Sequence, residues 1–365
     1  MTDETFCYGE CASMPFNPRF TITPKINKAL VEIERVRGFL DAVKLRDEWV
    51  SDMQRSALVR EAHYSTHIEG TAISLDQAQD ILSGKKLKGI SRDDEKELLN
   101  YKRAMDFVSK YLGKGGPVSE GLVRELHKIT VRGVRGGEGQ PGAYRETQNY
   151  VVNVRTNEAV YTPPPPVEVP LLMHEFVDWI NENIEEMSPV LVSAIAQFQF
   201  VHIHPFVDGN GRTARLLSTL ILYKTGYDFK RLFTISEYYD QNRPAYYSAI
   251  QSVRENKMDM TAWLEYFVHG LRSQMKEIQD KGKKVISADK FVESFQDKGL
   301  NERQEKIIRY LVINGRITNE ECQKVSGSIR RTATRDLSSL VKKGIIEMKG
   351  ELRGAYYVLA KPVEI

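Results

Sequence analysis

The chain has 365 residues, of which 41% are hydrophobic, and it carries a formal net charge of +3 at pH 7. This length accommodates two or three domains with a sizeable core, and so small a net charge says little about partners. No apolar run approaches the length of a membrane helix, and the N-terminus lacks the pattern of a signal peptide. Cys7, Cys11 and Cys322 are too few and too scattered for a disulfide framework, which indicates a reducing compartment. We therefore expect a cytoplasmic protein with no membrane partner.

Helical patterns dominate the first third of the chain. Prolines interrupt residues 1–25, and a capping box of Ser74 and Gln77 marks the start of one later helix. Ser119 is the expected N-cap of another. We expect helices over residues 25–43, 45–69, 75–83, 92–112 and 119–131.

The second of these helices ends in an unusual way. Gly70 occupies the position that follows a helix C-terminus, so Glu69 lies in the last turn. A carboxylate is disfavoured there, because the C-terminal end of the helix dipole is negative. A cationic partner elsewhere in the fold would explain Glu69. His63 and His67 are spaced by four residues, but no acidic ligands accompany them in the pattern of a zinc site.

A β-hairpin is the one clear β signal before residue 340. Residues 150–152 and 159–161 flank a polar turn and are rich in valine and tyrosine. Four consecutive prolines, 163–166, follow as a stiff spacer. The pattern predicts a small hairpin that is joined stiffly to the next part of the chain.

Residues 204–215, HPFVDGNGRTAR, are the most informative stretch. The flanking segments, 189–203 and 212–223, are apolar almost all round, as buried helices are. Pro205 excludes the preceding residue from the α region, so the first helix should end at about His204. The dodecapeptide is therefore a polar loop that connects two buried helices.

The loop opens onto a helix N-terminus, where free N–H groups and the helix dipole favour an anion. Gly209 and Gly211 let the backbone approach phosphate oxygens without a Cβ clash. Arg212 and Arg215 project from one face of the first turn and can each bind phosphate through two N–H groups. These features predict a polyphosphate site.

Three further side chains of the loop suit phosphoryl chemistry. Asp208 is an oxygen ligand suited to Mg²⁺, Asn210 can donate an amide hydrogen bond, and His204 has the ordinary pKa of a general base. A triphosphate, a metal and a base together imply attack by a hydroxyl on phosphorus. Two alternatives remain open: a metal site of His202, His204 and Asp208, which the arginines would oppose, and a structural loop, which would leave buried charges without a purpose.

Residues 301–365 differ in character from the rest. A helix from Asn301, a short helix from Asn319, a helix over 328–343 and two β-like segments at 346–348 and 355–359 resemble a winged helix-turn-helix. Residues 328–353 hold seven basic side chains against three acidic ones, a local charge of +4. DNA contact through 328–353 is one interpretation of this charge, and dimerisation or docking of a partner is the other.

Residues 204–215 resemble the signature of the Fic family, HxFx(D/E)GNGRxxR, at every fixed position. The resemblance implies transfer of AMP from ATP to a Ser, Thr or Tyr hydroxyl of a protein. It also implies a hairpin flap that presents the target segment, and Phe206 as an anchor in the core. The implied site residues are His204 as the base, Asp208 as the Mg²⁺ ligand, Gly209, Asn210 and Gly211 around the α- and β-phosphates, Arg212 at the β-phosphate and Arg215 at the γ-phosphate.

Residues 65–70 are similar to the inhibitory motif of that family, (S/T)xxxE(G/N), with Ser65, Glu69 and Gly70 at the matching positions. The resemblance implies that Glu69 pairs with Arg215 and keeps it from the γ-phosphate. Removal of AMP by means of Glu69 is an alternative activity, and another nucleotide or a phosphocholine donor is a lesser one. A DNA-binding regulator with a nucleotide-sensing core is an alternative of another class, but sensing would not need His204.

We therefore expect a mainly α protein, with a Fic-type helical bundle, a small hairpin flap and a C-terminal winged-helix domain. Residues 237–239 and 246–247 are aromatic-rich and either line an adenine pocket or pack in the core. The expected partners are ATP with Mg²⁺, a target protein, DNA and a second copy of the chain. The expected divisions are an N-terminal helical region over 1–110, the catalytic core over 111–275, a helical linker over 276–300 and the winged helix over 301–365.

Overall fold

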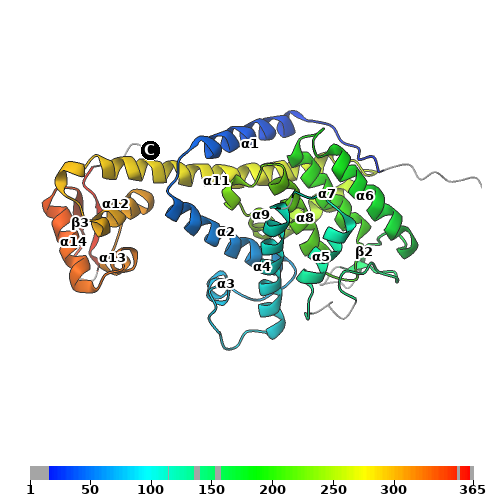
Figure 1. The fold of residues 1–365 in the computed structure, drawn as a ribbon, viewed down its shortest axis with the longest axis horizontal. Helices are drawn as coiled ribbons and strands as arrows, with labels where there is room; N and C mark the ends of the chain where they lie inside the picture. The colour runs from blue at the N-terminus through cyan, green and yellow to red at the C-terminus, as the bar shows by residue number, and fades with distance from the viewer. Residues whose placement is uncertain (1–15, 114, 135–139, 153–157, 352–353, 362–365) are drawn as a thin grey trace, which may run out of the picture. The chain divides into compact units, whose positions relative to one another are not determined.

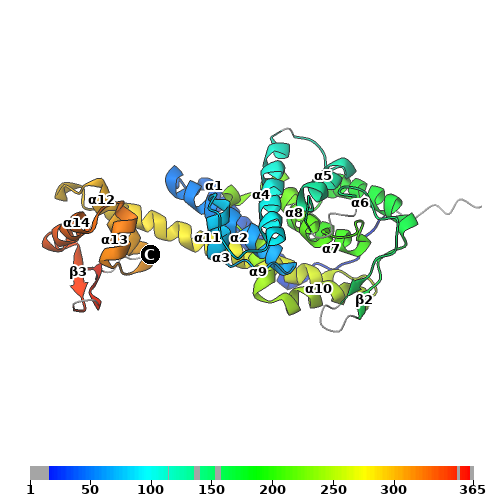
Figure 2. The same ribbon diagram turned by 90° about the horizontal axis from the view of Figure 1, so that it is seen from below.

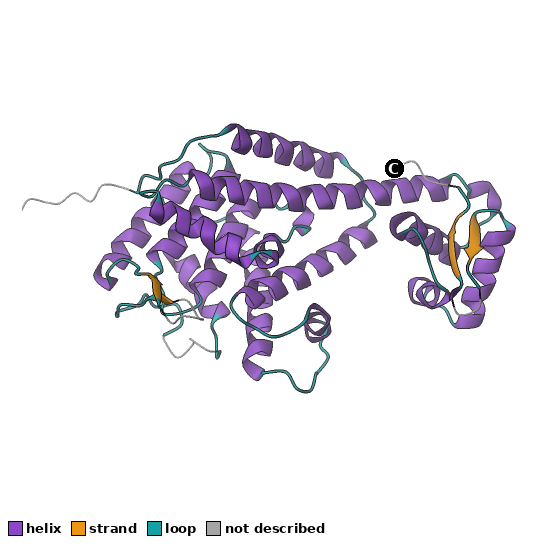
Figure 3. Ribbon diagram, turned by 180° about the vertical axis from the view of Figure 1, so that it is seen from behind, coloured by secondary structure: helices purple, strands orange, loops and turns teal. Residues whose placement is uncertain are grey.

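The computed structural model describes residues 16–113, 115–134, 140–152, 158–351 and 354–361, and this part is mainly helical with two short hairpins (Figures 1 and 3). Cys7, Cys11 and residues 1–15 of the irregular lead that was predicted over residues 1–25 lie outside these ranges, and α1 begins at Pro24, just inside the predicted lead. None of the helices in the described ranges is long and apolar enough to cross a membrane.

The predicted N-terminal helices are present with their predicted caps. Ser74 and Gln77 form a reciprocal capping box, and Ser119 accepts a hydrogen bond from the amide of Leu122. Gly70 has φ +105°, a left-handed value that suits the residue after a helix. The helices are α1 (Pro24–Ala42), α2 (Asp47–Ile68), α3 (Leu75–Leu82), α4 (Arg92–Leu112) and α5 (Glu120–Thr130).

Two helices that are buried on all sides form the centre of the next part. They are α7 (Pro189–Ile203) and α8 (Asn210–Lys224), which pack against each other. Helices α4 and α5 pack on α8, and α6 packs on α7 (Figure 2). The other elements are β1 (Val151–Val152), β2 (Ala159–Tyr161), α6 (Val169–Asn183), α9 (Ile235–Gln241), α10 (Arg243–Glu255) and α11 (Thr261–Glu293), with one-turn 3₁₀ helices at Pro166–Glu168, Phe229–Arg231 and Gln296–Lys298.

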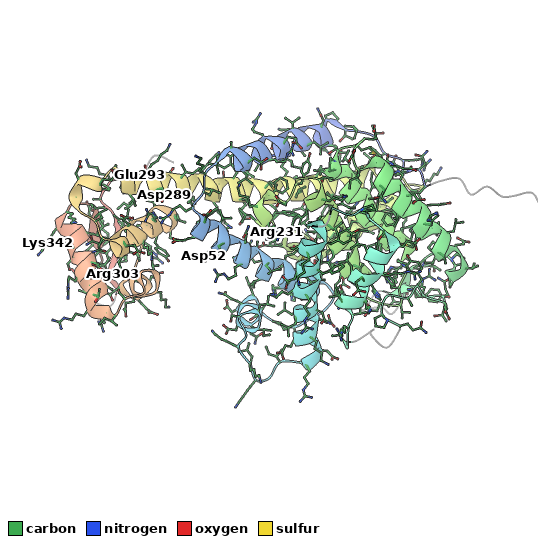
Figure 4. All side chains as sticks on the ribbon, viewed as in Figure 1. Asp52, Arg231, Asp289, Glu293, Arg303 and Lys342 are labelled. Carbon is green, nitrogen blue, oxygen red and sulfur yellow. The ribbon has the colours of Figure 1, made fainter. Side chains whose placement is uncertain are left out.

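The C-terminal elements agree with the predicted order. They are α12 (Glu302–Asn314), α13 (Asn319–Ser326), α14 (Arg330–Lys342), β3 (Ile346–Lys349) and β4 (Tyr356–Leu359). The two strands pair antiparallel, and Ile317 forms an isolated bridge with Tyr357. Buried aliphatic side chains from all three helices and β3 make a separate small core. Figure 4 labels Arg303 of α12, whose Nε donates to the buried carboxylate of Asp336 at 2.7 Å.

The chain divides into two compact units, residues 1–37 with 52–274 and residues 38–51 with 275–365. This differs from the expected division into four parts. Residues 52–110 belong to the same unit as the expected catalytic core, because α4 buries one face against α5 and α8. Most of the expected linker is the second half of α11, which is a single helix of 33 residues. Apolar periodicity predicts the helices, but it does not show which helices share a core.

Candidate functional site

The first element of the site is the end of α7. His204 follows its last residue with φ +53° and ψ +57°, and its amide donates to the carbonyl of Phe200 at 2.9 Å. The amide and Nε of Arg145 donate to the carbonyls of Pro205 and His204, both at 2.9 Å. The chain therefore leaves α7 in a left-handed turn, and a buried arginine fixes that turn. Sequence reasoning predicted the end of the helix but missed Arg145.

The imidazole of His204 is arranged to accept a proton. Its Nδ1 lies 3.2 Å from the carbonyl of Val201, so Nδ1 carries the hydrogen and Nε2 keeps a free lone pair. Burial lowers the pKa of His204 to about 4, and the charges of Arg145 and Arg254 act in the same direction. The side chain is therefore neutral at pH 7, as a general base must be.

Phe206 and Asn210 give the loop its shape. Phe206 is fully buried, as expected of an anchor. Its amide donates to Oδ1 of Asn210 at 3.0 Å, and Nδ2 of Asn210 donates to its carbonyl at 2.8 Å. We expected Asn210 to donate to a phosphate, whereas in this structure its amide closes the loop. Gly209 has φ +75°, and a Cβ there would overlap Val131, so only glycine fits this turn.

His127 of α5 supports the same loop and was missed by sequence reasoning. Its ring stacks on Phe206, with 3.7 Å between ring centroids. The amide of Gly142 donates to Nδ1 at 2.9 Å, and Nε2 donates to the carbonyl of Asp208 at 2.9 Å. Burial lowers the pKa of His127 to about 4, which keeps this tautomer neutral. No local signal distinguishes His127 in the sequence, because it occupies an ordinary position on the buried face of a helix.

The carboxylate of Asp208 is held at the rim of the loop, where 46% of its side chain is exposed. Mg²⁺ commonly takes one or two protein carboxylates and completes its coordination with phosphates and water. A single exposed carboxylate beside a helix N-terminus therefore fits the metal of a nucleotide complex. No group of three or more His, Cys, Asp or Glu side chains in the described ranges could hold a metal by itself.

The alternative metal site is not assembled. Nδ1 of His202 lies 2.8 Å from the hydroxyl of Tyr161, which also lies 2.8 Å from the carbonyl of His202. This contact ties strand β2 to the end of α7. The predicted hairpin is thus present, with β1 and β2 paired antiparallel, and its turn at 153–157 lies outside the described residues.

Arg212 is buried in the first turn of α8, with 3% of its side chain exposed. Its Nη1 lies 3.0 Å from Oε2 of Glu97 on α4, and its Nη2 lies 3.5 Å from Oδ2 of Asp208. Its Nε forms no hydrogen bond within the described part of the chain. Glu97 is a third residue that sequence reasoning missed, since nothing in its surroundings in the sequence marks it as a partner of Arg212.

Arg215 is bound mainly by the end of α2 and the residue after it, with a further contact to Tyr246. Its Nε donates to the hydroxyl of Ser65 at 2.8 Å, and its Nη2 donates to the carbonyl of Ser65 at 2.8 Å and to Oε1 of Glu69 at 2.7 Å. The guanidinium is 1% exposed and the Glu69 side chain 26%. Glu69 also lies against the loop, because a Cβ at Gly211 would overlap Oε1 of Glu69. The cationic partner expected for Glu69 is therefore Arg215, 146 residues away.

Glu69 and Arg215 each stabilise the charged form of the other. Burial works to raise the pKa of Glu69, but the charges of Arg215 and Arg212 and the hydrogen bond from Arg215 outweigh it, so the pKa lies below its usual value. Burial likewise works to lower the pKa of Arg215, and Glu69 reverses that effect and raises it. Both groups are therefore ionised at neutral pH.

The aromatic residues near the site divide between core and surface. Tyr239 and Tyr246 are buried and stack on each other, with 4.4 Å between ring centroids. Tyr247 is 50% exposed, and its hydroxyl lies 3.5 Å from the carbonyl of Ile68 at the end of α2. Core packing thus accounts for Tyr239 and Tyr246, and Tyr247 is the member of this group that is open to a ligand.

Comparisons with known proteins agree with this geometry. The sequence model of the Fic/DOC family matches residues 117–222, from before α5 to near the end of α8. Proteins named protein adenylyltransferase Fic from Drosophila grimshawi and Culex quinquefasciatus are 32% and 34% identical over 202 and 203 residues, 55% of this chain. These alignments cover 40% and 39% of those proteins, so the similarity spans less than half of their length.

Among solved structures, a Fic family protein from Desulfovibrio desulfuricans G20 has a similar fold. The TM-score is 0.65 with 24% identity, and the match covers 94% of this chain and 98% of that one. Family match, sequence relatives and fold all coincide with the loop and helices described above. The chain therefore carries a Fic/DOC family domain over residues 117–222.

Proposed function

We propose that this chain transfers AMP from ATP to a Ser, Thr or Tyr hydroxyl of a protein, itself included, and that Glu69 inhibits the transfer. The observation that carries the proposal is the convergence of three features. They are the N-terminus of α8, the neutral imidazole of His204, and an Arg215 that is occupied by Ser65 and Glu69. The relatives named protein adenylyltransferase support the same activity.

In the proposed reaction the target hydroxyl attacks the α-phosphorus of ATP. A new P–O bond forms to the target, the bond between the α-phosphorus and the bridging oxygen breaks, and pyrophosphate leaves. Nε2 of His204 accepts the hydroxyl proton, because its Nδ1 is engaged with Val201. The amides at the start of α8 and the guanidinium of Arg212 lie where they can bind the phosphates of the leaving group.

The fit of Asp208 to Mg²⁺ supports its role as the metal ligand. Bound there, the metal would neutralise charge that develops on the phosphates. His127 and Asn210 hold the backbone on either side of Asp208, so the carboxylate is preorganised at the rim. Gly209 and Gly211 keep the loop open to phosphate oxygens.

Inhibition follows from the occupancy of Arg215. The Nε and Nη2 edge of the guanidinium already donates to Ser65 and Glu69, so this edge cannot bind the γ-phosphate through two parallel hydrogen bonds. The negative charge of Glu69 beside Gly211 also repels a phosphate from the loop. ATP that binds under these conditions is held in a pose unsuited to transfer.

The hairpin suits the presentation of a target segment. Tyr150, Val152 and Val160 are 58%, 45% and 49% exposed, and they leave an apolar strand surface next to α7. An extended peptide can add to such an edge through backbone hydrogen bonds. Tyr161 connects this edge to His202, two residues from the proposed base.

The test uses ATP labelled on the α- or the γ-phosphate, with the Glu69→Gly variant so that inhibition cannot hide the activity. We expect label in protein from α-labelled ATP only, together with release of pyrophosphate. His204→Ala in the same background should abolish labelling while ATP still binds. Incorporation of the γ-label, or equal labelling with and without His204, would refute the proposal. Mass spectrometry of a treated lysate would then identify the target residue.

For residues 301–361 we propose a winged helix-turn-helix that contacts DNA through α14. Arg330, Arg331 and Arg335 are exposed on that helix, and no carboxylate of the described residues forms an ion pair with them. The test is a retardation assay of the full chain on random duplex DNA at low salt. Arg331→Ala and Arg335→Ala should each weaken binding and reduce the salt slope by about one. Lys324→Ala, on the exposed face of α13, is the matched control. If the parent protein retards no DNA, docking of a protein partner is the better interpretation.

Removal of AMP by means of Glu69 and a purely nucleotide-sensing core are not proposed. In this structure Glu69 is engaged with Arg215 rather than free to position a water molecule. His204 is arranged as a base, which a sensor would not require.

A further inference from the structure

Arg212 lies between two carboxylates of very different exposure. Glu97 on α4 is 4% exposed and lies 3.0 Å from Nη1. Asp208 is 46% exposed and lies 3.5 Å from Nη2, which is longer than a well-formed charged hydrogen bond. One guanidinium thus contacts both a fixed buried carboxylate and the carboxylate proposed to hold Mg²⁺.

The hydrogen bonds of Arg212 are incomplete. Its Nε and Nη1 have no well-aligned acceptor within the described residues, although Nη1 is within ion-pair distance of Glu97. Buried guanidinium N–H groups without acceptors are costly, so Arg212 has a strong tendency to take any acceptor within reach. Besides a phosphate, the acceptor that Arg212 already contacts is the carboxylate of Asp208, four residues earlier. The charge of Arg212 also acts on Glu69, so the test is best made in the Glu69→Gly background as well.

We propose that Glu97 is a positioning residue that holds the guanidinium of Arg212 off Asp208 and so keeps Asp208 available to Mg²⁺. The inference rests on the proposed function, in which Asp208 binds the metal. Glu97 projects from the second turn of α4, between the buried Asp94 and Tyr101, so we expect it to stay in place if Arg212 moves toward the loop. The position of Arg212 therefore depends on a helix that lies outside residues 117–222.

Loss of the Glu97 charge should let Arg212 swing to Asp208 and pair with it. Mg²⁺ would then have to displace a guanidinium before it could bind. This competition for Asp208 is distinct from the general effect of the Glu97 charge on the nucleotide, because removing one negative charge near the phosphates should by itself tighten ATP binding. The diagnostic quantity is therefore the factor by which Mg²⁺ strengthens nucleotide binding, compared with the factor of a variant that loses the same charge from the same helix without contacting Arg212.

The experiment measures the affinity of the full chain for α,β-methylene ATP by calorimetry, with and without Mg²⁺. This analogue cannot be cleaved between the α- and β-phosphorus, so the measurement is independent of transfer. In Glu97→Gln the Mg²⁺ factor should fall about fivefold, which corresponds to one partly exposed ion pair. Glu95→Gln, two residues earlier on α4, should keep the factor of the parent. Asp208→Asn should bring the factor close to one.

Glu97→Asp keeps the charge and provides a second variant in case Glu97→Gln does not fold. Its Mg²⁺ factor should lie between the values of the parent and Glu97→Gln. A parent-like factor in a folded Glu97→Gln, or in Glu97→Asp if only that variant folds, would overturn the inference, as would an unchanged factor in Asp208→Asn. If Glu69→Gly transfers no AMP but the Mg²⁺ factor still depends on Glu97, the proposed function is refuted and the positioning role of Glu97 is supported.

Discussion

Replacement of Glu69 should make the protein less stable and more active at the same time. The Glu69 carboxylate lies 2.7 Å from Nη2 of Arg215, and the arginine is 1% exposed. Glu69→Gly removes the only side-chain carboxylate that pairs with Arg215 in the described residues, and Ser65 keeps its two hydrogen bonds. The perturbation therefore frees one N–H group of the guanidinium, on Nη2, without releasing the whole side chain.

The magnitude follows from the exposure of the pair. Exposed ion pairs contribute about 0–1 kcal/mol, and breaking a fully buried pair costs about 3–5 kcal/mol. Because Glu69 is 26% exposed, we expect Glu69→Ala to lower the free energy of unfolding by about 2 kcal/mol. Glycine at position 69, in the turn after α2, should add a smaller loss, because it increases the backbone freedom of the unfolded chain. Transfer should rise at least about tenfold if the blocked arrangement is favoured by about 1.4 kcal/mol.

The assay pairs urea unfolding with labelling by α-labelled ATP for the parent, Glu69→Ala and Glu69→Gly. Glu69→Asp should be intermediate in both measurements, because its shorter side chain reaches Arg215 poorly. Arg215→Ala in the Glu69→Gly background should reverse the gain in labelling. Asp52→Ala is the control on the same helix, since Asp52 is 76% exposed and, among the described residues, pairs only with Arg55, three residues away (Figure 4).

The decisive result is a rise in labelling together with a fall in the free energy of unfolding. If labelling by Glu69→Gly stays at or below the parent level while the protein remains folded, the inhibitory role of Glu69 is wrong. If labelling rises but the free energy of unfolding does not change, the ion pair is not what holds α2 against Arg215. Loss of AMP release from a modified substrate in the same variant would instead favour the alternative activity.

Three further outcomes are expected. The rate of transfer by Glu69→Gly should be constant from pH 8 down to about pH 5 and fall near pH 4. The reason is that His204 must be neutral to accept a proton, and burial lowers its pKa to about 4. A midpoint at the ordinary pKa of histidine would contradict this. His127→Ala should lower the free energy of unfolding by about 2–3 kcal/mol in urea and reduce transfer, because the amide of Gly142 and the carbonyl of Asp208 lose their partner. Gly211→Ala should lower the free energy of unfolding more in the parent than in the Glu69→Gly background, since the added Cβ overlaps Glu69. Equal losses in the two backgrounds of this double-mutant cycle would exclude that contact.

Much of the fold was predictable because its signals are local. The capping box of Ser74, the break at Pro205 and the apolar pattern of residues 189–203 each depend on neighbours a few residues away. Glu69 was predictable for the same reason, since an anion at the C-terminal end of α2 requires compensation. Arg215 was predicted as its partner from the resemblance of residues 65–70 to a known motif, and not from the chemistry of the segment.

The residues that sequence reasoning missed act through tertiary contacts. Arg145, His127 and Glu97 lie 59, 81 and 115 residues from the loop residues that they contact, and none is part of a local pattern. The contact of the Asn210 side chain with Phe206 was also not apparent from the sequence. An asparagine side chain after a glycine can serve a ligand or the backbone equally well, and only the position of Phe206 shows that it closes the loop.

Arg212 and Arg215 are chemically equal and three residues apart, yet their partners assign them different functions. Glu97 contacts Arg212 from the second turn of α4 and is 4% exposed, so we expect that contact to persist when nucleotide binds. Glu69 holds Arg215 from the turn after α2, partly exposed and next to the left-handed Gly70, where we expect a helix end to move away at small cost. One arginine is thus positioned permanently and the other can be released. Since both carboxylates lie outside residues 117–222, the N-terminal helices are integral to the proposed site. A domain confined to the family region would leave Arg215 without Glu69, and Arg212 with Asp208 alone as its ion-pair partner.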